Sequence, residues 1–141
     1  MNPTILLVDD DDFFKRLIER AVSKSRFKVS LQHVWDGEEA ISYLSRGENF
    51  CDAAKYPCPA LVLLDLKMPR VDGFEVLEWR LTRSELKEMP FVILTSSDLQ
   101  RDRERALALG ADHYFVKPIS WQELVAIIET LDTLCGKTNP G

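Results

Sequence analysis

The sequence lacks a long apolar run and lacks an excess of basic residues. A membrane-spanning helix needs about 20 consecutive apolar residues, and no stretch approaches that length. Residues 1–4 lack the basic start and long apolar stretch of a secretory signal. The net charge of −5 argues against a nucleic-acid-binding face, which is normally basic. We therefore expect a cytoplasmic protein that contacts neither a membrane nor nucleic acid.

Cysteine and histidine are also scarce. The three cysteines, Cys51, Cys58 and Cys135, have no metal-type spacing, and the two histidines lie far from them in the sequence. Reduced thiols are expected in a cytoplasmic chain, although a disulfide between Cys51 and Cys58 within one loop stays open. The length of 141 residues fits one domain with its own core. These features argue against a zinc site or a disulfide framework.

The most informative stretch is the apolar run at residues 61–64, which stops at a single carboxylate, Asp65. Four consecutive apolar residues indicate a strand that is buried on both faces, as in parallel sheets. Pro69 and Gly73 follow and indicate a turn. Asp65 is therefore expected at the carboxyl end of a central strand, where open α/β sheets bind their ligands.

Comparable apolar segments alternate with amphipathic ones along the chain. Strands are predicted at residues 4–8, 28–34, 61–65, 90–95 and 113–117. Each is followed by a predicted helix, with Asp36 and Ser120 as N-caps and Gly110 as a C-terminal glycine. Strict alternation predicts an α/β fold, with a parallel sheet, right-handed crossovers and helices on both faces. Residues 45–59 form the longest irregular stretch.

Four of the predicted strands end in polar side chains. Asp9 and Asp10 follow the first strand, Asp65 the third, Thr95 the fourth and Lys117 the fifth. These ends share one edge of a parallel sheet, where three carboxylates need a cation, and oxygen ligands favour a hard ion such as Mg²⁺. With Lys117 and Thr95 to stabilise charge, the set predicts a phosphoryl site in which Asp65 is the covalent acceptor.

At this point the motifs resemble a known family. They are Val8-Asp9-Asp10, Leu64-Asp65-Leu66-Lys67-Met68-Pro69 with Asp72-Gly73, Ile93-Leu94-Thr95-Ser96, Gly110-Ala111-Asp112 and Val116-Lys117-Pro118. In this order they resemble the response-regulator receiver domain of two-component signalling over residues 4–132, as in single-domain chemotaxis regulators. The resemblance implies a flavodoxin-like, doubly wound five-stranded sheet of order 2-1-3-4-5 with five helices. It also implies a receiver domain at 1–135 and a short flexible tail at 136–141.

The resemblance assigns roles to individual residues. Asp65 would accept a phosphoryl group from a sensor histidine kinase or a histidine phosphotransfer protein. Asp9, Asp10 and Asp65 would hold Mg²⁺ together with the backbone carbonyl of Lys67. Lys117 would pair with the phosphoryl group and precede a cis peptide bond to Pro118.

The resemblance also implies how the signal leaves the site. Thr95 would turn inward to the phosphoryl group, Tyr114 would follow, and a protein-binding face would change for an unknown downstream protein. Such a chain is a phosphoacceptor with Mg²⁺-dependent self-phosphorylation and self-dephosphorylation, and not an enzyme. It could be a monomer or a homodimer. The long loop before Pro59 resembles that of regulators paired with phytochrome-type histidine kinases.

Two alternatives compete with this interpretation. A phosphohydrolase of the haloacid-dehalogenase type would use Asp9 as its nucleophile, with Asp11 two residues on. That chemistry also needs an acidic metal ligand after the lysine strand, which is missing, and it leaves the motif at Asp65 unexplained. A pseudo-receiver that binds partners without phosphorylation is the other alternative, and the complete acceptor, metal, threonine and lysine set argues against it.

Overall fold

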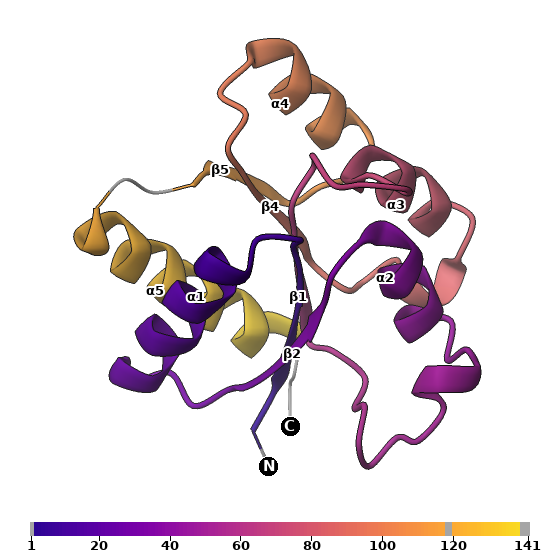
Figure 1. Ribbon diagram of the computed structural model, residues 1–141, viewed down its shortest axis with the longest axis horizontal. Coiled ribbons are helices and arrows are strands. Elements are labelled where there is room, and N and C mark those ends of the chain that lie inside the picture. The colour runs from indigo at the N-terminus through magenta and orange to yellow at the C-terminus, as the bar shows by residue number, and fades with distance from the viewer. Residues whose placement is uncertain (1, 118–119, 139–141) are drawn as a thin grey trace.

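The computed structural model describes residues 2–117 and 120–138. Its centre is a parallel sheet of five strands in the order β2-β1-β3-β4-β5 (Figure 1). The strands are β1 Thr4–Val8, β2 Ser30–Val34, β3 Leu61–Leu64, β4 Phe91–Thr95 and β5 His113–Val116. This order confirms the flavodoxin-like topology expected from the sequence. It also brings the carboxyl ends of β1, β3, β4 and β5 to one edge.

Five α-helices cover the two faces of the sheet. They are α1 Asp12–Lys24, α2 Gly37–Leu44, α3 Gly73–Arg80, α4 Gln100–Ala108 and α5 Trp121–Thr138. Helices α1 and α5 share one face, and α2, α3 and α4 lie on the other (Figure 1). Two short 3-10 helices, η1 Glu48–Phe50 and η2 Ser84–Leu86, interrupt the loops before β3 and β4. Within the described residues, no helix combines the length and apolarity that a bilayer crossing requires.

The predicted helix ends are confirmed in detail. The Asp36 side chain accepts a hydrogen bond from the Glu39 amide at 2.9 Å and so caps α2. The Ser120 hydroxyl accepts from the Glu123 amide at 3.2 Å at the start of α5. Gly110 has a φ of +102° directly after the C-cap of α4, a conformation that glycine adopts without steric cost.

Several boundaries differ from those expected. Strand β2 begins at Ser30 and not at residue 28, and β5 ends at Val116, so Lys117 lies just beyond it. Helix α5 continues through Thr138, so residues 136–138 are helical although a flexible tail was expected from residue 136. Glycine costs a helix about 1 kcal/mol relative to alanine, and a single one at position 136 does not end α5.

The sheet separates two apolar layers. Strands β1, β3 and β4 are buried on both faces, which explains their uninterrupted apolar sequences. One layer packs Leu6, Val62 and Ile93 against α2 and α3, and the other packs Ile5, Leu63 and Leu94 against α1 and α5. The central strands are therefore packed on both faces, which fixes the positions of the polar residues that follow their carboxyl ends.

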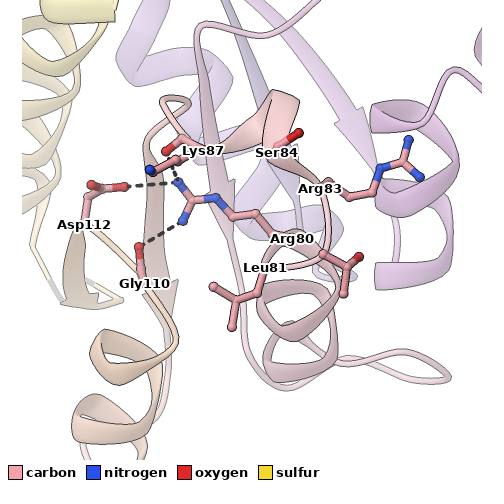
Figure 2. Close-up of a pocket in the computed structure, with 8 residues that line it drawn as sticks. Arg80, Leu81, Arg83, Ser84, Lys87, Gly110 and Asp112 are labelled. Carbon is pink, nitrogen blue, oxygen red and sulfur yellow. Dashed lines mark hydrogen bonds and ion pairs between the residues drawn. The ribbon is translucent and has the colours of Figure 1, made fainter.

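A buried arginine ties together the loops at the amino ends of β4 and β5. The guanidinium of Arg80 donates to four carbonyl oxygens: Leu86 at 3.4 Å, Gly110 at 2.9 Å, Lys87 at 3.3 Å and Met89 at 2.6 Å. It also lies 4.0 Å from a carboxylate oxygen of Asp112 (Figure 2). Arg80, Lys87, Gly110 and Asp112 are among the residues that line a hollow of about 510 Å³. Because the Arg80 guanidinium is already hydrogen-bonded to carbonyl oxygens, we assign it a structural role in holding these loops together and do not interpret the hollow as a ligand site.

Replacing Arg80 should therefore destabilise the fold. The substitution Arg80→Lys keeps the charge but removes the planar fork, and it leaves buried and partly buried carbonyls without donors, at a cost of about 2–4 kcal/mol in the free energy of unfolding. Urea denaturation followed by circular dichroism measures this loss. Arg83→Lys is the matched control, because the Arg83 side chain is partly exposed, pairs with the nearby Glu85 at 2.7 Å and lies over the Trp79 ring at 5.4 Å, without a cluster of carbonyl partners. Equal, small effects of the two substitutions would contradict the assigned role of Arg80.

Candidate functional site

The candidate site is built on backbone hydrogen bonds that continue just past the strand ends. The Asp9 amide donates to the Val34 carbonyl at 3.2 Å, and the Asp65 amide donates to the Val8 carbonyl at 3.0 Å. The Lys117 amide donates to the Thr95 carbonyl at 2.7 Å. The residues that carry the functional side chains are thus held by the sheet itself, and their side chains converge on the same edge.

Three carboxylates meet at this edge. Oxygen atoms of Asp9, Asp10 and Asp65 all lie within 4.8 Å of one another. Asp9 and Asp65 are buried, with 1% and 4% of their surface exposed, whereas Asp10 is exposed. The Lys117 ammonium lies 3.1 Å from Asp9 Oδ2 and 3.4 Å from Asp65 Oδ2. One lysine therefore bridges the two buried carboxylates.

One lysine does not neutralise this cluster. Burial and the neighbouring charge of Asp65 raise the pKa of Asp9 to about 6, although the Asp11 amide and Lys117 act in the opposite direction. Burial alone would lower the pKa of Lys117, but the charges of Asp65 and Asp9 outweigh it and raise that pKa. A convergent set of oxygen ligands with excess negative charge fits a hard divalent cation.

The aspartates that follow Asp10 serve the start of α1. Asp11 is the N-cap, and its side chain accepts from the amides of Phe13 at 3.0 Å and Phe14 at 3.2 Å. Asp12 pairs with Arg16 one turn later, at 3.0 Å. Asp11 Oδ2 also lies 3.9 Å from the Lys117 ammonium. Within the acidic run at residues 9–12, Asp9 and Asp10 thus belong to the cluster, Asp11 caps the helix at the border of the cluster, and Asp12 serves the helix alone.

The loop after β3 is packed closely behind Asp65. The Gly73 amide donates to the Leu66 carbonyl at 3.0 Å, and a Cβ at Gly73 would collide with the Asp65 carbonyl oxygen. Glycine is required here because α3 begins against the backbone of Asp65. In the same loop the Lys67 amide donates to Asp65 Oδ1 at 3.3 Å. The loop thereby orients the Asp65 carboxylate.

The two residues expected to form a switch are both buried. Thr95 is fully buried at the end of β4, and its hydroxyl oxygen accepts from the Ser97 amide at 3.5 Å. Tyr114 is 6% exposed, and its hydroxyl donates to the Ser97 carbonyl at 2.9 Å. Ser97 thus connects the two side chains. The expected cis bond at Pro118 lies outside the described residues.

Two polar residues near the cluster were not assigned a role from the sequence. A ring nitrogen of His33, Nε2, lies 2.8 Å from the Asp9 carbonyl oxygen, and Trp35 packs edge-on against the His33 ring. Asp102 on α4 contacts the side chains of Lys67 and Ser97. In the sequence, His33 lies within a predicted strand, and Asp102 lies in a run of charged residues typical of a solvated helix. No motif in the sequence marks either residue as part of the site.

Comparison with known proteins gives the family. Residues 5–129 match the model of the response regulator receiver domain. The probable methanogenesis regulatory protein FilR2 of Methanothrix harundinacea is 37% identical over 128 residues, which are 90% of this chain and 79% of that protein. The transcriptional regulatory protein GltR of Pseudomonas aeruginosa is also 37% identical, over 91% of this chain. The match covers 48% of GltR, so the chain spans about half the length of that relative.

Solved structures agree with this assignment. The phosphorylated cyanobacterial phytochrome response regulator RcpA superimposes with a TM-score of 0.86 and 30% identity, over 99% of this chain and 97% of that one. The Mn²⁺-bound form of response regulator Rcp1 superimposes with a TM-score of 0.81 and 29% identity, over 93% and 92%. The chain belongs to the response regulator receiver domain family, whose members are signalling proteins of two-component systems.

Proposed function

We propose that this chain is a phospho-accepting response regulator in which Asp65 receives a phosphoryl group from a histidine. The donor is a sensor histidine kinase or a histidine phosphotransfer protein. The observation that carries the proposal is the position of the Lys117 ammonium, 3.4 Å from Asp65 and 3.1 Å from Asp9. A fixed positive charge between the acceptor and the remaining carboxylates is what a transferring phosphoryl group needs.

The proposed transfer is a displacement at phosphorus. An Asp65 carboxylate oxygen attacks, an O–P bond forms, and the N–P bond to the donor imidazole breaks with its electron pair left on nitrogen. Lys117 balances charge on the phosphoryl oxygens, and Thr95 donates a hydrogen bond to one of them. Asp65 is positioned for the attack because the Lys67 amide holds its Oδ1 while Lys117 faces its Oδ2.

The acidic cluster is proposed to bind Mg²⁺. The carboxylates of Asp9, Asp10 and Asp65 and the backbone carbonyl of Lys67 would hold it, and bound Mg²⁺ would supply positive charge to the phosphoryl oxygens. The raised pKa of Asp9 and the excess negative charge support this proposal. So does the Mn²⁺-bound form of Rcp1, a structure 29% identical to this chain.

The output is proposed to be a change of a protein-binding face. Thr95 and Tyr114 would move together when phosphate arrives, since both are hydrogen-bonded to Ser97. Strand β5 and the start of α4 would carry that movement to a downstream protein. We place this activity in residues 1–135 and in the cytoplasm, and we propose a phytochrome-type kinase as donor, because RcpA is a phytochrome response regulator.

The acceptor assignment can be tested with acetyl phosphate, a small phosphodonor, and Mg²⁺. Intact mass spectrometry should find one labile phosphate on the wild type and none on the Asp65→Asn protein, because an amide is not a nucleophile for this transfer. Asp98→Asn is the matched control, since Asp98 is exposed and should leave phosphorylation unchanged. Phosphorylation of Asp65→Asn at the wild-type rate, or steady phosphate release that needs Asp9, would contradict the proposal.

The cost of ionising Asp9 gives a second prediction. Its pKa is raised to about 6 by burial, so the carboxylate destabilises the metal-free fold above that pH. At about pH 7.5, Asp9→Asn should raise the free energy of unfolding of the metal-free protein by about 1–2 kcal/mol. Below the pKa that Asp9 has in the unfolded chain, its carboxyl group is protonated in both states and costs the fold nothing. The advantage of Asp9→Asn in the free energy of unfolding should therefore shrink as the pH falls from about 6 towards 4.

Urea denaturation at these two ends of the pH range measures the difference between Asp9→Asn and wild type. Any contribution of His33 is common to both proteins and cancels. Added Mg²⁺ should reverse the order, because only the wild type retains the full ligand set and gains stability by binding. A metal-free wild type that is more stable than Asp9→Asn at about pH 7.5 would contradict the assigned electrostatics.

A further inference from the structure

A buried carboxylate on α4 joins the two loops that border the acceptor residue. Asp102 is only 7% exposed although it lies in the charged first turn of a surface helix. Its Oδ2 accepts a hydrogen bond from the Ser97 hydroxyl at 2.6 Å. The same oxygen lies 3.4 Å from the ammonium nitrogen of Lys67. One carboxylate oxygen thus connects the loop after β3 with the loop after β4.

Both partners of Asp102 reach the acceptor site through their own backbones. The Lys67 amide donates to Asp65 Oδ1 at 3.3 Å. The Ser97 amide donates to the Thr95 hydroxyl at 3.5 Å, and the Ser97 carbonyl accepts from Tyr114 at 2.9 Å. Asp102 is therefore connected to Asp65 through Lys67. It is connected to the proposed switch residues, Thr95 and Tyr114, through Ser97.

We propose that Asp102 is a positioning residue that holds Lys67 and Ser97 in the arrangement of the unphosphorylated chain, and so slows phosphoryl transfer to Asp65. This inference rests on the proposed function and adds to it a residue that restrains the reaction. A phosphoryl group on Asp65 carries new negative charge and competes with Asp102 for the Lys67 ammonium. Thr95 must also leave the Ser97 amide before its hydroxyl can turn to the phosphoryl group, and Asp102 holds Ser97 in place.

The electrostatics of Asp102 support this role. The Ser97 hydroxyl and, after it, the Lys67 charge lower the pKa of Asp102, so the carboxylate is ionised at neutral pH. The Lys67 side chain is 57% exposed, and ion pairs of such partly exposed lysines contribute little to stability. The ion pair between Lys67 and Asp102 is consequently weak enough for Lys67 to exchange Asp102 for another anion. The hydrogen bond from Ser97 fixes the position of the Asp102 carboxylate.

The simplest competing explanation is local. An acidic residue in the first turn of a helix stabilises the positive N-terminal end of that helix, whatever it contacts. Asp102 would then affect the stability of α4 without any dependence on Lys67. The two explanations differ in whether the effects of Asp102 and Lys67 substitutions on the reaction are coupled.

A double-mutant cycle on the phosphorylation rate tests the proposal. Wild type, Asp102→Asn, Lys67→Gln and the double mutant are incubated with acetyl phosphate and Mg²⁺, and the phosphorylated fraction is followed by intact mass. Asp102→Asn is nearly isosteric and should raise the rate constant about fivefold, the effect expected when a weak ion pair is released. In the Lys67→Gln background the same substitution should have less than half of that effect on a logarithmic scale, about twofold.

Two variants serve as controls. Glu104→Gln removes one negative charge from the same helix at an exposed site, where the Glu104 carboxylate accepts a hydrogen bond from the Gln100 side chain at 3.2 Å, and it should leave the rate unchanged. Asp102→Glu keeps the charge and should stay within about twofold of wild type. Mg²⁺ affinity measured by calorimetry should be the same for wild type and Asp102→Asn, because Asp102 is outside the acidic cluster.

The outcomes separate this inference from the proposed function. If wild type takes up no phosphate, the proposed function itself fails. If wild type is phosphorylated and Asp102→Asn behaves like Glu104→Gln, only the role of Asp102 is overturned. A full fivefold effect of Asp102→Asn in the Lys67→Gln background, as roughly additive substitutions would give, would leave Asp102 with a local helix role alone.

Discussion

The contact on which the rest of the site depends is the bridge from Lys117 to Asp9 and Asp65, at 3.1 Å and 3.4 Å. Two buried carboxylates on neighbouring strands repel each other, and the lysine at the end of β5 makes their proximity tolerable. Its charge does not fully offset the burial of Asp9 and the repulsion from Asp65, so the pKa of Asp9 stays raised. The residual negative charge that destabilises the metal-free fold is what a divalent cation would neutralise, and we propose that this cation, with Lys117, then attracts the phosphoryl group. Stability is thus lowered at the edge of the sheet where we propose that the transfer takes place.

Much of this arrangement could be predicted from the sequence, for a physical reason. Strands β1, β3 and β4 are buried on both faces, so they appear as unbroken apolar runs, and Asp9, Asp65 and Thr95 lie where such a run stops. In a parallel sheet those stops share an edge. The position of Asp65 and the identity of its neighbours therefore follow from local sequence together with one topological rule. Helix ends such as Gly110 follow from backbone conformation in the same way.

The parts that could not be predicted depend on contacts between segments with no local pattern. Arg80 meets Gly110 and Met89 only because η2 and the loop before β5 pass the end of α3. Asp102 looks like one more charge on a solvated helix, yet it is buried against Lys67 and Ser97. In both cases tertiary packing determines where the charged side chain lies. The sequence shows that the residue is charged but not which groups it contacts. Such residues determine how the loops around the acceptor are held.

The central claim is that Asp65, and no other carboxylate of the cluster, carries the phosphoryl group. Borohydride reduction of the phosphorylated protein tests it most directly, because it reduces an acyl phosphate to an alcohol and converts the modified aspartate into homoserine. Peptide sequencing by mass spectrometry then locates that residue. The account predicts homoserine at position 65 and unmodified aspartate at positions 9 and 10. Homoserine at position 9, with position 65 unchanged, would contradict it and would indicate a phosphohydrolase mechanism instead.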